Sequence, residues 1–323
     1  MRDFTSRVNR QCRKINIFLV TFAVGSTLCV AQDRDFTKVQ IRITRVGGTV
    51  YMLQGQDENI GVSVGEDGLV VVDDDYAALA TRIDTALKSL SSKPIRFIVN
   101  THYHPDHVNG NEYFQEQAPI IAHDNARKRL QQGGTIGNLG SIAWEAKPMP
   151  KPGLPILTFD HEITIHLNGE DIQVRHVQSG HTDGDSIVFF PKSNVVHMGD
   201  YYLRIGFPVI DLGGGGSVSG LIAGLEGVIS ELPPDVKVIP GHGEISSLDD
   251  IRTYVKMLKE TLAVVETGVK KGKSLEELKR EKVLEPWKEW SGFISSEDYL
   301  ETLYNDLTGK RGGIAQRGTK VPK

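Results

Sequence analysis

Four side chains that can bind a metal ion lie within six positions of the segment THYHPDHVNGN, residues 101–111. They are His102, His104, Asp106 and His107. The chain has ten histidines, and chance rarely places three of them so close together. The first two histidines are two residues apart, so in an extended segment they point to the same side and can share one ion. The aspartate and the third histidine follow Pro105 and can face a second ion.

Three distant segments supply further candidates, each beside a glycine and at the end of an expected strand. They are SGHTDGD with His181, VVHMGD with Asp200, and VIPGHGE with His242. Together with the first loop they give five histidines and two aspartates, enough for two ions. Imidazole and carboxylate without thiolate favour Zn²⁺, with iron, manganese or cobalt as competitors. Paired ions lower the pKa of bound water to about 7 and polarise a carbonyl oxygen, so the pattern predicts hydrolysis without a protein nucleophile.

The N-terminus is interpreted as a signal peptide over residues 1–31. Five basic residues precede or begin an apolar run, and Cys29 and Ala31 stand at the −3 and −1 positions of the expected cleavage site. The run is too short and too interrupted for a span of about 20 apolar residues, although an uncleaved anchor remains the alternative. We therefore expect a periplasmic or secreted protein with no stable membrane insertion after cleavage. Both cysteines would be removed, which excludes disulfides and thiolate ligands.

Charge favours a small-molecule substrate as the partner. The chain has 37 basic and 41 acidic residues, and cleavage would remove five basic residues and one acid. The remaining excess of acidic residues argues against general nucleic-acid binding. The last segment, 309–323, carries five basic residues and no acid, and we expect a disordered tail. The oligomeric state is left open.

Alternating and helical patterns predict a layered α/β protein. Short strands are expected within 39–75 and at 95–100, 119–123, 162–167, 171–178, 186–191, 194–200 and 236–240. Helices are expected at 76–90, 125–131, 217–232, 248–268, 274–282 and 296–307. Residues 133–155, rich in Gly and Pro, are expected to form a long functional or disordered loop. These elements suggest two sheets packed face to face with helices outside.

Over residues 40–245 the sequence resembles the metallo-β-lactamase superfamily, whose loop pattern is His-x-His-x-Asp-His. The resemblance implies a four-layer αβ/βα sandwich with two mixed sheets, here as a domain over 36–246 with a C-terminal helical extension over 247–308. It implies His102, His104 and His181 as ligands of a first metal. It implies Asp106, His107 and His242 as ligands of a second, with Asp200 bridging the two. Asp106 is also the expected catalytic residue.

Some positions depart from one β-lactamase subclass, which has a cysteine where this chain has Asp200 and a lysine where it has Leu203. Arg204 and Tyr202 are candidate substrate contacts, although Tyr202 could equally be a packing residue. Asp73 could orient a metal ligand or cap the helix that begins near Tyr76. The segment DLGGGGS, 211–217, lacks the lysine of a phosphate-binding loop and is interpreted as a flexible rim of the site. Five other histidines are interpreted as structural or surface residues: His123, His161, His166, His176 and His197.

Three functions compete. The first is an exported zinc hydrolase with two metals, in which a bridging hydroxide attacks a β-lactam, lactone, ester or thioester and Asp106 orients it. A mononuclear iron oxidoreductase that oxidises persulfides is the second, and the complete second ligand set argues against it. The third is a non-enzymatic metal-binding accessory protein of a periplasmic oxidation system.

Overall fold

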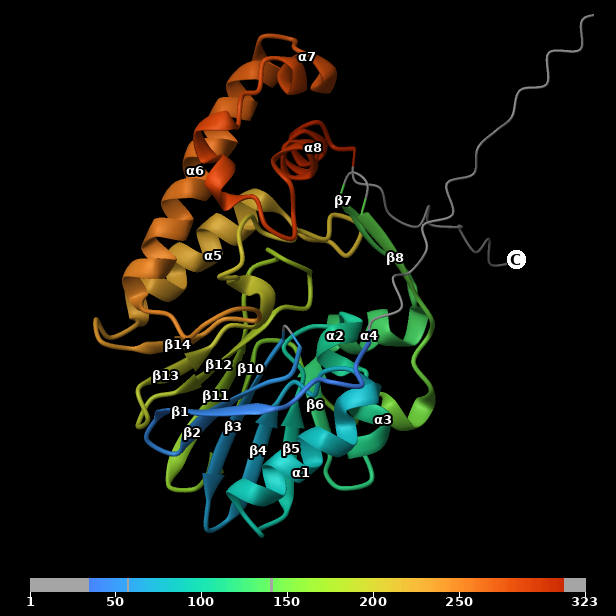
Figure 1. The fold of residues 1–323 in the computed structure, drawn as a ribbon, viewed down its shortest axis with the longest axis vertical. Helices are drawn as coiled ribbons and strands as arrows, with labels where there is room; N and C mark the ends of the chain where they lie inside the picture. Colours follow the sequence, from blue (N-terminus) through green and yellow to red (C-terminus); the bar gives the residue numbers. More distant parts are fainter. Residues whose placement is uncertain (1–34, 57, 140–141, 311–323) are drawn as a thin grey trace, which may run out of the picture. The chain divides into compact units, whose positions relative to one another are not determined.

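The computed structural model describes residues 35–56, 58–139 and 142–310 (Figure 1). The predicted signal peptide lies outside the described residues, as does the predicted tail beyond Lys310, so both remain predictions. No helix within the described ranges is long and apolar enough to cross a membrane.

The first sheet is mixed and has the strand order β1-β2-β3-β4-β5-β6-β9 within the described chain. Its strands are β1 (Arg42–Gly47), β2 (Val50–Gln54), β3 (Asn59–Gly65), β4 (Gly68–Val72), β5 (Ile95–Val99), β6 (Ile120–His123) and β9 (Leu157–Phe159). Neighbours from β1 to β4 are antiparallel, and neighbours from β4 to β9 are parallel. The parallel strands end at one edge of the sheet, where polar side chains can meet.

The second sheet has the order β10-β11-β12-β13-β14. Its strands are β10 (Glu162–Leu167), β11 (Glu170–His176), β12 (Ser186–Phe190), β13 (Val195–His197) and β14 (Lys237–Ile239). Only the pair β13 and β14 is parallel among these neighbours. The two mixed sheets confirm the expected layered α/β architecture.

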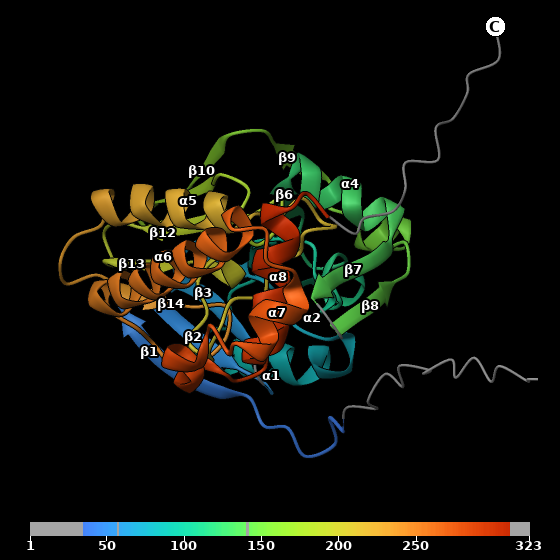
Figure 2. The same cartoon turned by 90° about the horizontal axis from the view of Figure 1, so that it is seen from above.

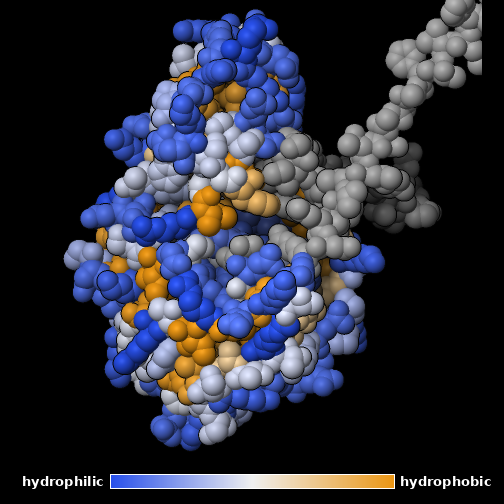
Figure 3. Space-filling model, viewed as in Figure 1, coloured by the Kyte–Doolittle hydropathy of each residue, from blue (hydrophilic) through white to orange (hydrophobic). Residues whose placement is uncertain are grey.

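Helices cover the outer faces of both sheets (Figures 1 and 2). The α-helices are α1 (Ala80–Leu90), α2 (Pro105–Val108), α3 (Asn111–Phe114), α4 (Asp124–Gln132), α5 (Val218–Glu231), α6 (Leu248–Lys270), α7 (Leu275–Arg280) and α8 (Ser296–Leu307). Short 3₁₀ helices are η1 (Ala77–Leu79), η2 (Lys151–Gly153), η3 (Gly199–Tyr201) and η4 (Glu285–Trp290). Figure 2 shows α5 and α6 beside each other over β12 to β14, and Figure 3 shows mostly hydrophilic groups where α6 and α7 face solvent.

Alternation along the central strands builds the layers. In β4, Val70 and Val72 point into the core between the sheets, whereas Leu69 and Val71 pack under α1. In β12 the same alternation sends Val188 between the sheets and sends Ile187 toward α5 and α6. Strands buried on both faces read as continuous apolar runs, which is why VVV and SIVFF lack polar alternation.

The C-terminal helices share a core with the second sheet. Leu258 on α6 and Leu303 on α8 are buried in the same cluster as Leu225 on α5. Ser247 begins α6 with a capping box, because its hydroxyl accepts the backbone N–H of Asp250 while the Asp250 carboxylate accepts that of Ser247. The predicted helices 248–268 and 296–307 agree with α6 and α8 to within two residues. The division between a domain ending at 246 and an extension from 247 remains a prediction.

The conformation expected for residues 133–155 was wrong. Residues 133–155, predicted as a long loop, contain the antiparallel hairpin β7 (Gly134–Leu139) and β8 (Ile142–Ala146), followed by η2. The glycines that suggested a loop allow the left-handed backbone in this hairpin, with φ of 123° at Gly134 and 91° at Gly137. The predicted helix 76–90 is likewise divided into η1 and α1.

Candidate metal centre

The metal-capable side chains stand at the ends of strands from both sheets. The first loop follows β5, and α2 begins at Pro105, whose fixed φ suits a first helical position. His181 lies in the connection from β11 to β12. Asp200 lies in η3 after β13, and His242 follows β14. Because β13 and β14 are parallel, their ends bring Asp200 and His242 to the same edge.

All seven predicted ligands come together in two adjoining clusters. The first cluster is His102, His104, His181 and Asp200, and the second is Asp106, His107 and His242. Within each cluster the potential ligand atoms lie within 4.8 Å of one another. Asp200 also reaches the second cluster, since its Oδ1 lies 3.1 Å from His107 Nε2 and 3.3 Å from His242 Nε2. Its other oxygen lies 3.6 Å from His181 Nε2, which is the arrangement expected of a bridging carboxylate.

Hydrogen bonds on the outer ring nitrogens leave the inner nitrogens of the first cluster without protons. His181 Nδ1 donates to the carbonyl oxygen of Val209 at 2.7 Å, so its Nε2 is bare when the ring is neutral. His104 Nε2 donates to Asp211 Oδ2 at 3.1 Å, so its Nδ1 is bare. These bare atoms face one another at 2.9 Å. Two lone pairs at that distance repel unless a proton or a metal ion lies between them, so the donor set fits a metal ion.

His102 completes this pattern. Its Nδ1 lies 3.1 Å from Thr101 Oγ1, and that hydroxyl donates to Asp73 Oδ2, so the ring nitrogen is the donor to Thr101. The bare Nε2 is buried and has no hydrogen-bond partner within the described residues. Burial and the neighbouring imidazoles hold the pKa of His102 well below its ordinary value. Burial also lowers the pKa of His181 to about 4. Neutral imidazoles are the form that binds metal.

The histidines of the second cluster lie among three carboxylates, those of Asp73, Asp106 and Asp200. His107 Nδ1 donates to Asp73 Oδ2 at 2.9 Å, which leaves Nε2 facing His242 Nε2 at 3.4 Å. Burial opposes a charge on His242, but the carboxylates of Asp200 and Asp106 raise its pKa to about 10. These carboxylates thus attract a positive charge, and a bound metal would replace the proton on His242.

Asp73 therefore orients ligands, as one of the two sequence interpretations predicted. Besides His107, its carboxylate accepts the backbone N–H and the hydroxyl of Thr101, at 2.7 and 2.8 Å. The capping alternative is wrong, because Tyr76 has no side-chain cap and its N–H bonds to Asp75. Thr182 is held by Asp185 in a local turn.

The side chains of the two candidate substrate residues have other partners. Tyr202 is 2% exposed and packs in the hydrophobic core against Tyr254, which is the packing alternative. The Arg204 guanidinium pairs with Asp250 at 3.0 Å. Either side chain would have to leave these partners to reach a substrate, and their substrate contact remains a prediction.

Asp211 was missed by sequence reasoning. Its buried carboxylate contacts the predicted ligand His104 and also accepts the Tyr103 hydroxyl and the backbone N–H of Gly214. The interpretation of 211–217 as a flexible rim was wrong, because the glycines are closely packed: a Cβ at Gly216 would lie 2.4 Å from the His181 carbonyl oxygen. The available signal was an aspartate directly before a run of glycines.

The remaining histidines lie outside both clusters. His197 is buried with Nε2 bonded to the Asn59 carbonyl at 3.1 Å. His123 and His176 stack with their ring centroids 3.7 Å apart. His161 and His166 have exposed side chains beside local aspartates.

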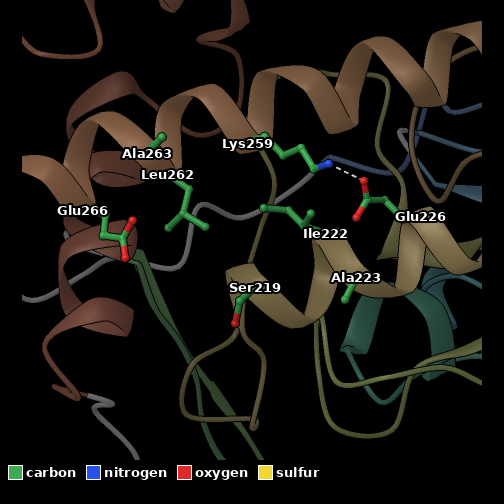
Figure 4. A pocket seen from close by; sticks show the side chains of 8 residues that line it. All are labelled: Ser219, Ile222, Ala223, Glu226, Lys259, Leu262, Ala263 and Glu266. Atoms are coloured by element: carbon green, nitrogen blue, oxygen red, sulfur yellow. Dashed lines mark hydrogen bonds and ion pairs between the residues drawn. The ribbon is translucent and has the colours of Figure 1, made fainter.

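A groove of about 250 Å³ lies between α5 and α6, away from the clusters (Figure 4). Ile222 and Leu262 line it, and an ion pair between Lys259 and Glu226 stands at one side. It contains none of the predicted ligands.

Together, the two mixed sheets and the paired histidine and aspartate clusters at their edge define a metal-binding αβ/βα sandwich. A family model described as the metallo-beta-lactamase superfamily matches residues 53–281. The chain belongs to this superfamily, as the loop pattern predicted.

Individual relatives are distant. The chain is 24% identical to the metallo-beta-lactamase type 2 of Bacteroides fragilis, over 71% of this chain and 89% of that one. It is 28% identical to an uncharacterized protein of Aquifex aeolicus (strain VF5), over 58% of this chain and 85% of the relative.

Solved structures share the fold. A metallo-beta-lactamase from Pontibacter korlensis superposes with a TM-score of 0.53 and 18% identity, covering 68% of this chain and 99% of its own. The DIM-1 metallo-beta-lactamase gives a TM-score of 0.51 and 21% identity, covering 69% of this chain and 99% of its own.

Proposed function

We propose that the protein is an exported zinc-dependent hydrolase that holds two metal ions and cleaves a carbonyl substrate, a β-lactam or a related lactone, ester or thioester. The observation that carries the proposal is the pair of adjoining clusters joined by Asp200. Membership of the metallo-beta-lactamase superfamily supports it. The donor set of imidazoles and carboxylates favours zinc, and iron or manganese are the alternatives to test.

When bound, paired metal ions supply a water of lowered pKa and polarise the carbonyl oxygen. The residues of this chain set the geometry for that chemistry. Asp106 lies at the first turn of α2, its side chain is 21% exposed, and its Oδ2 lies 3.5 Å from His242 Nε2. Burial opposes its charge, but His107 and His242 hold the pKa of Asp106 below its ordinary value. A carboxylate so placed can accept a hydrogen bond from the attacking water, orient it, and hold its proton for the leaving group.

The mononuclear iron alternative needs only one ligand set. Here Asp106, His107 and His242 form a second group beside the first, which favours the two-metal proposal. Metal analysis of the purified protein separates the two, since one iron per chain would overturn the present assignment.

The decisive experiment is a substrate panel on zinc-reconstituted protein lacking residues 1–31, with metal content measured in parallel. Nitrocefin, a short lactone series and a thioester are assayed side by side. We expect turnover of at least one class. Two bound zinc ions with no turnover across the panel would favour the accessory-protein alternative.

His104→Ala and Asp106→Ala test the site itself. Each should lower turnover by at least about 100-fold, the scale expected for loss of a ligand or a proton-handling group. Asp160→Ala is the matched control, because the exposed Asp160 carboxylate pairs with His161, which belongs to neither cluster. Full turnover in either site variant would overturn the assignment.

Export forms a separate part of the proposal. Cell fractionation of the full chain should place it in the periplasm or medium, and N-terminal sequencing should begin at Gln32. A protein that keeps its first residues and stays with the membrane would favour the uncleaved anchor.

A further inference from the structure

The carboxylate of Asp211 is a fully buried junction between the metal centre and the hairpin β7–β8. Its Oδ2 accepts the Tyr103 hydroxyl and the His104 Nε2–H, the latter at 3.1 Å. Its Oδ1 accepts two backbone N–H groups, from Gly214 at 2.8 Å and from Gly137 of β7 at 3.1 Å. Four donors therefore converge on one side chain.

The glycine run after Asp211 makes this junction possible. A Cβ at Gly214 would lie 2.3 Å from Asp211 Oδ2 and 2.5 Å from the Tyr103 hydroxyl oxygen, so a larger residue could not approach. The chain then turns back, and Gly216 N–H bonds to the Asp211 carbonyl at 2.8 Å. The segment DLGGGGS thus wraps its own aspartate.

The junction acts on a metal ligand. Because an ionised carboxylate only accepts hydrogen bonds, a neutral His104 must carry its proton on Nε2, and Nδ1 is then left bare to bind a metal. That Nδ1 is the atom facing His181 Nε2 at 2.9 Å. The partner of the outer nitrogen therefore decides which nitrogen can bind a metal.

We propose that Asp211 is a positioning residue that fixes the tautomer and orientation of His104, and that it ties the hairpin β7–β8 to the same point through Gly137. The proposal rests on the proposed function only in that His104 binds a metal. Movement of the hairpin at Gly137 would then act on the carboxylate that orients His104.

Asp211→Asn tests the proposal because the substitution should reverse the direction of the hydrogen bond between residue 211 and His104. Backbone N–H groups can only donate, so the amide oxygen must take the Oδ1 position facing Gly137 and Gly214. The amide NH₂ then faces His104 Nε2 and donates to it. His104 Nε2 becomes an acceptor, and the proton moves to Nδ1, the nitrogen that should bind the metal. Tyr103→Phe is the matched control, since it removes another donor from the same oxygen but keeps the aromatic ring beside His104 and the hydrogen bond of the imidazole.

Two measurements report the outcome without any substrate. Long-range ¹H–¹⁵N spectra of the metal-free protein should show His104 as the Nε2–H tautomer in the wild type and in Tyr103→Phe, and as Nδ1–H in Asp211→Asn. Chelator competition with Zn²⁺ and Co²⁺ should show about 10- to 100-fold weaker binding in Asp211→Asn. The visible spectrum of the cobalt form should also change, while Tyr103→Phe stays within about threefold of wild type.

Several results would overturn the proposal. Wild-type affinity and spectrum in Asp211→Asn would do so, and so would an equal loss in Tyr103→Phe, which indicates a general packing effect. If Asp211→Asn does not fold, the ¹H–¹⁵N spectrum of the metal-free wild type tests the proposal by itself. The Nδ1–H tautomer of His104 in that spectrum would contradict the proposal. Since no readout uses hydrolysis, an inactive but normally metal-loaded protein would count against the proposed function alone.

Discussion

His104 Nδ1 and His181 Nε2 lie 2.9 Å apart, and hydrogen bonds on their opposite ring nitrogens leave both atoms without protons. The partners that impose this state, Asp211 and the Val209 carbonyl, are both buried. With both rings neutral, this contact is unfavourable in the metal-free protein, whereas a bound metal ion makes it favourable. This relationship links the metal content of the protein to its stability.

Removing metal should therefore destabilise the fold. Chelation should lower the melting temperature, and adding Zn²⁺ should restore it, since a ligand at 100 times its Kd stabilises the native state by about 2.7 kcal/mol. Calorimetry with metal analysis measures this. The same titration on His104→Ala should give a smaller rise, and equal melting temperatures with chelator and with excess zinc would contradict the prediction.

Asp75 should limit stability at alkaline pH. Burial first, and then the neighbouring Glu58, raise the pKa of Asp75 to about 8, above the unfolded value near 3.8. A raised folded pKa gives stability that is complete below about 3.8 and is lost as the pH rises through about 8. Asp75→Asn should remove that loss. Urea unfolding from pH 6 to 9 should show that the free energy of unfolding of the variant increases relative to that of the wild type as the pH rises.

Asp235→Asn is the control for this prediction, because Asp235 is exposed. It should follow the wild type at every pH. A constant difference between Asp75→Asn and the wild type would mean that Asp75 does not titrate in this range.

The stacked pair of His123 and His176 should limit stability at acid pH. Burial lowers the pKa of both rings, and the neighbouring His123 lowers the pKa of His176 further. A lowered folded pKa gives stability that is present above about 6.5 and is lost as the pH falls below it. His176→Phe keeps an aromatic ring without a titrating group, so its stability should fall less between pH 6.5 and 5 than that of the wild type.

Urea unfolding of zinc-saturated protein measures how the free energy of unfolding changes between pH 6.5 and 5 while the metal ligands are occupied. His166→Phe serves as the control, because His166 is exposed beside Asp171. If the free energy of unfolding of His176→Phe falls with pH as steeply as that of the wild type, the pair does not cause the loss of stability at acid pH.

Two glycines of α5 should respond in opposite directions to alanine. A Cβ at Gly224 would lie 1.8 Å from the hydroxyl oxygen of buried Tyr201, whereas a Cβ at Gly227 would meet nothing within 4 Å. Gly224→Ala should destabilise by about 1–3 kcal/mol through overpacking. Gly227→Ala should stabilise by about 0.5–1 kcal/mol, because alanine favours the helix. Chemical denaturation measures the free energy of unfolding of the two variants. Equal changes in that free energy would contradict close packing of Gly224 against Tyr201.

The sequence by itself determined which side chains could bind a metal and most of the helices and strands. Residue type decides what can bind a metal, and the spacing in 101–111 with His181, Asp200 and His242 was sufficient to predict all seven members of the two clusters. Hydrophobic period also placed α6 and α8, because periodicity is a local property of the chain.

Only the tertiary structure decided how those ligands are oriented. Asp211 and His104 are 107 positions apart, and nothing local to either residue predicts their hydrogen bond. The hairpin β7–β8 was not predicted, because a segment rich in glycine is typical of a loop. In the fold, those glycines adopt left-handed backbone conformations within paired strands. A side chain's partners depend on which distant segments pack against it, so the ligand set followed from local chemistry, whereas the protonation and orientation of each ligand followed from the fold.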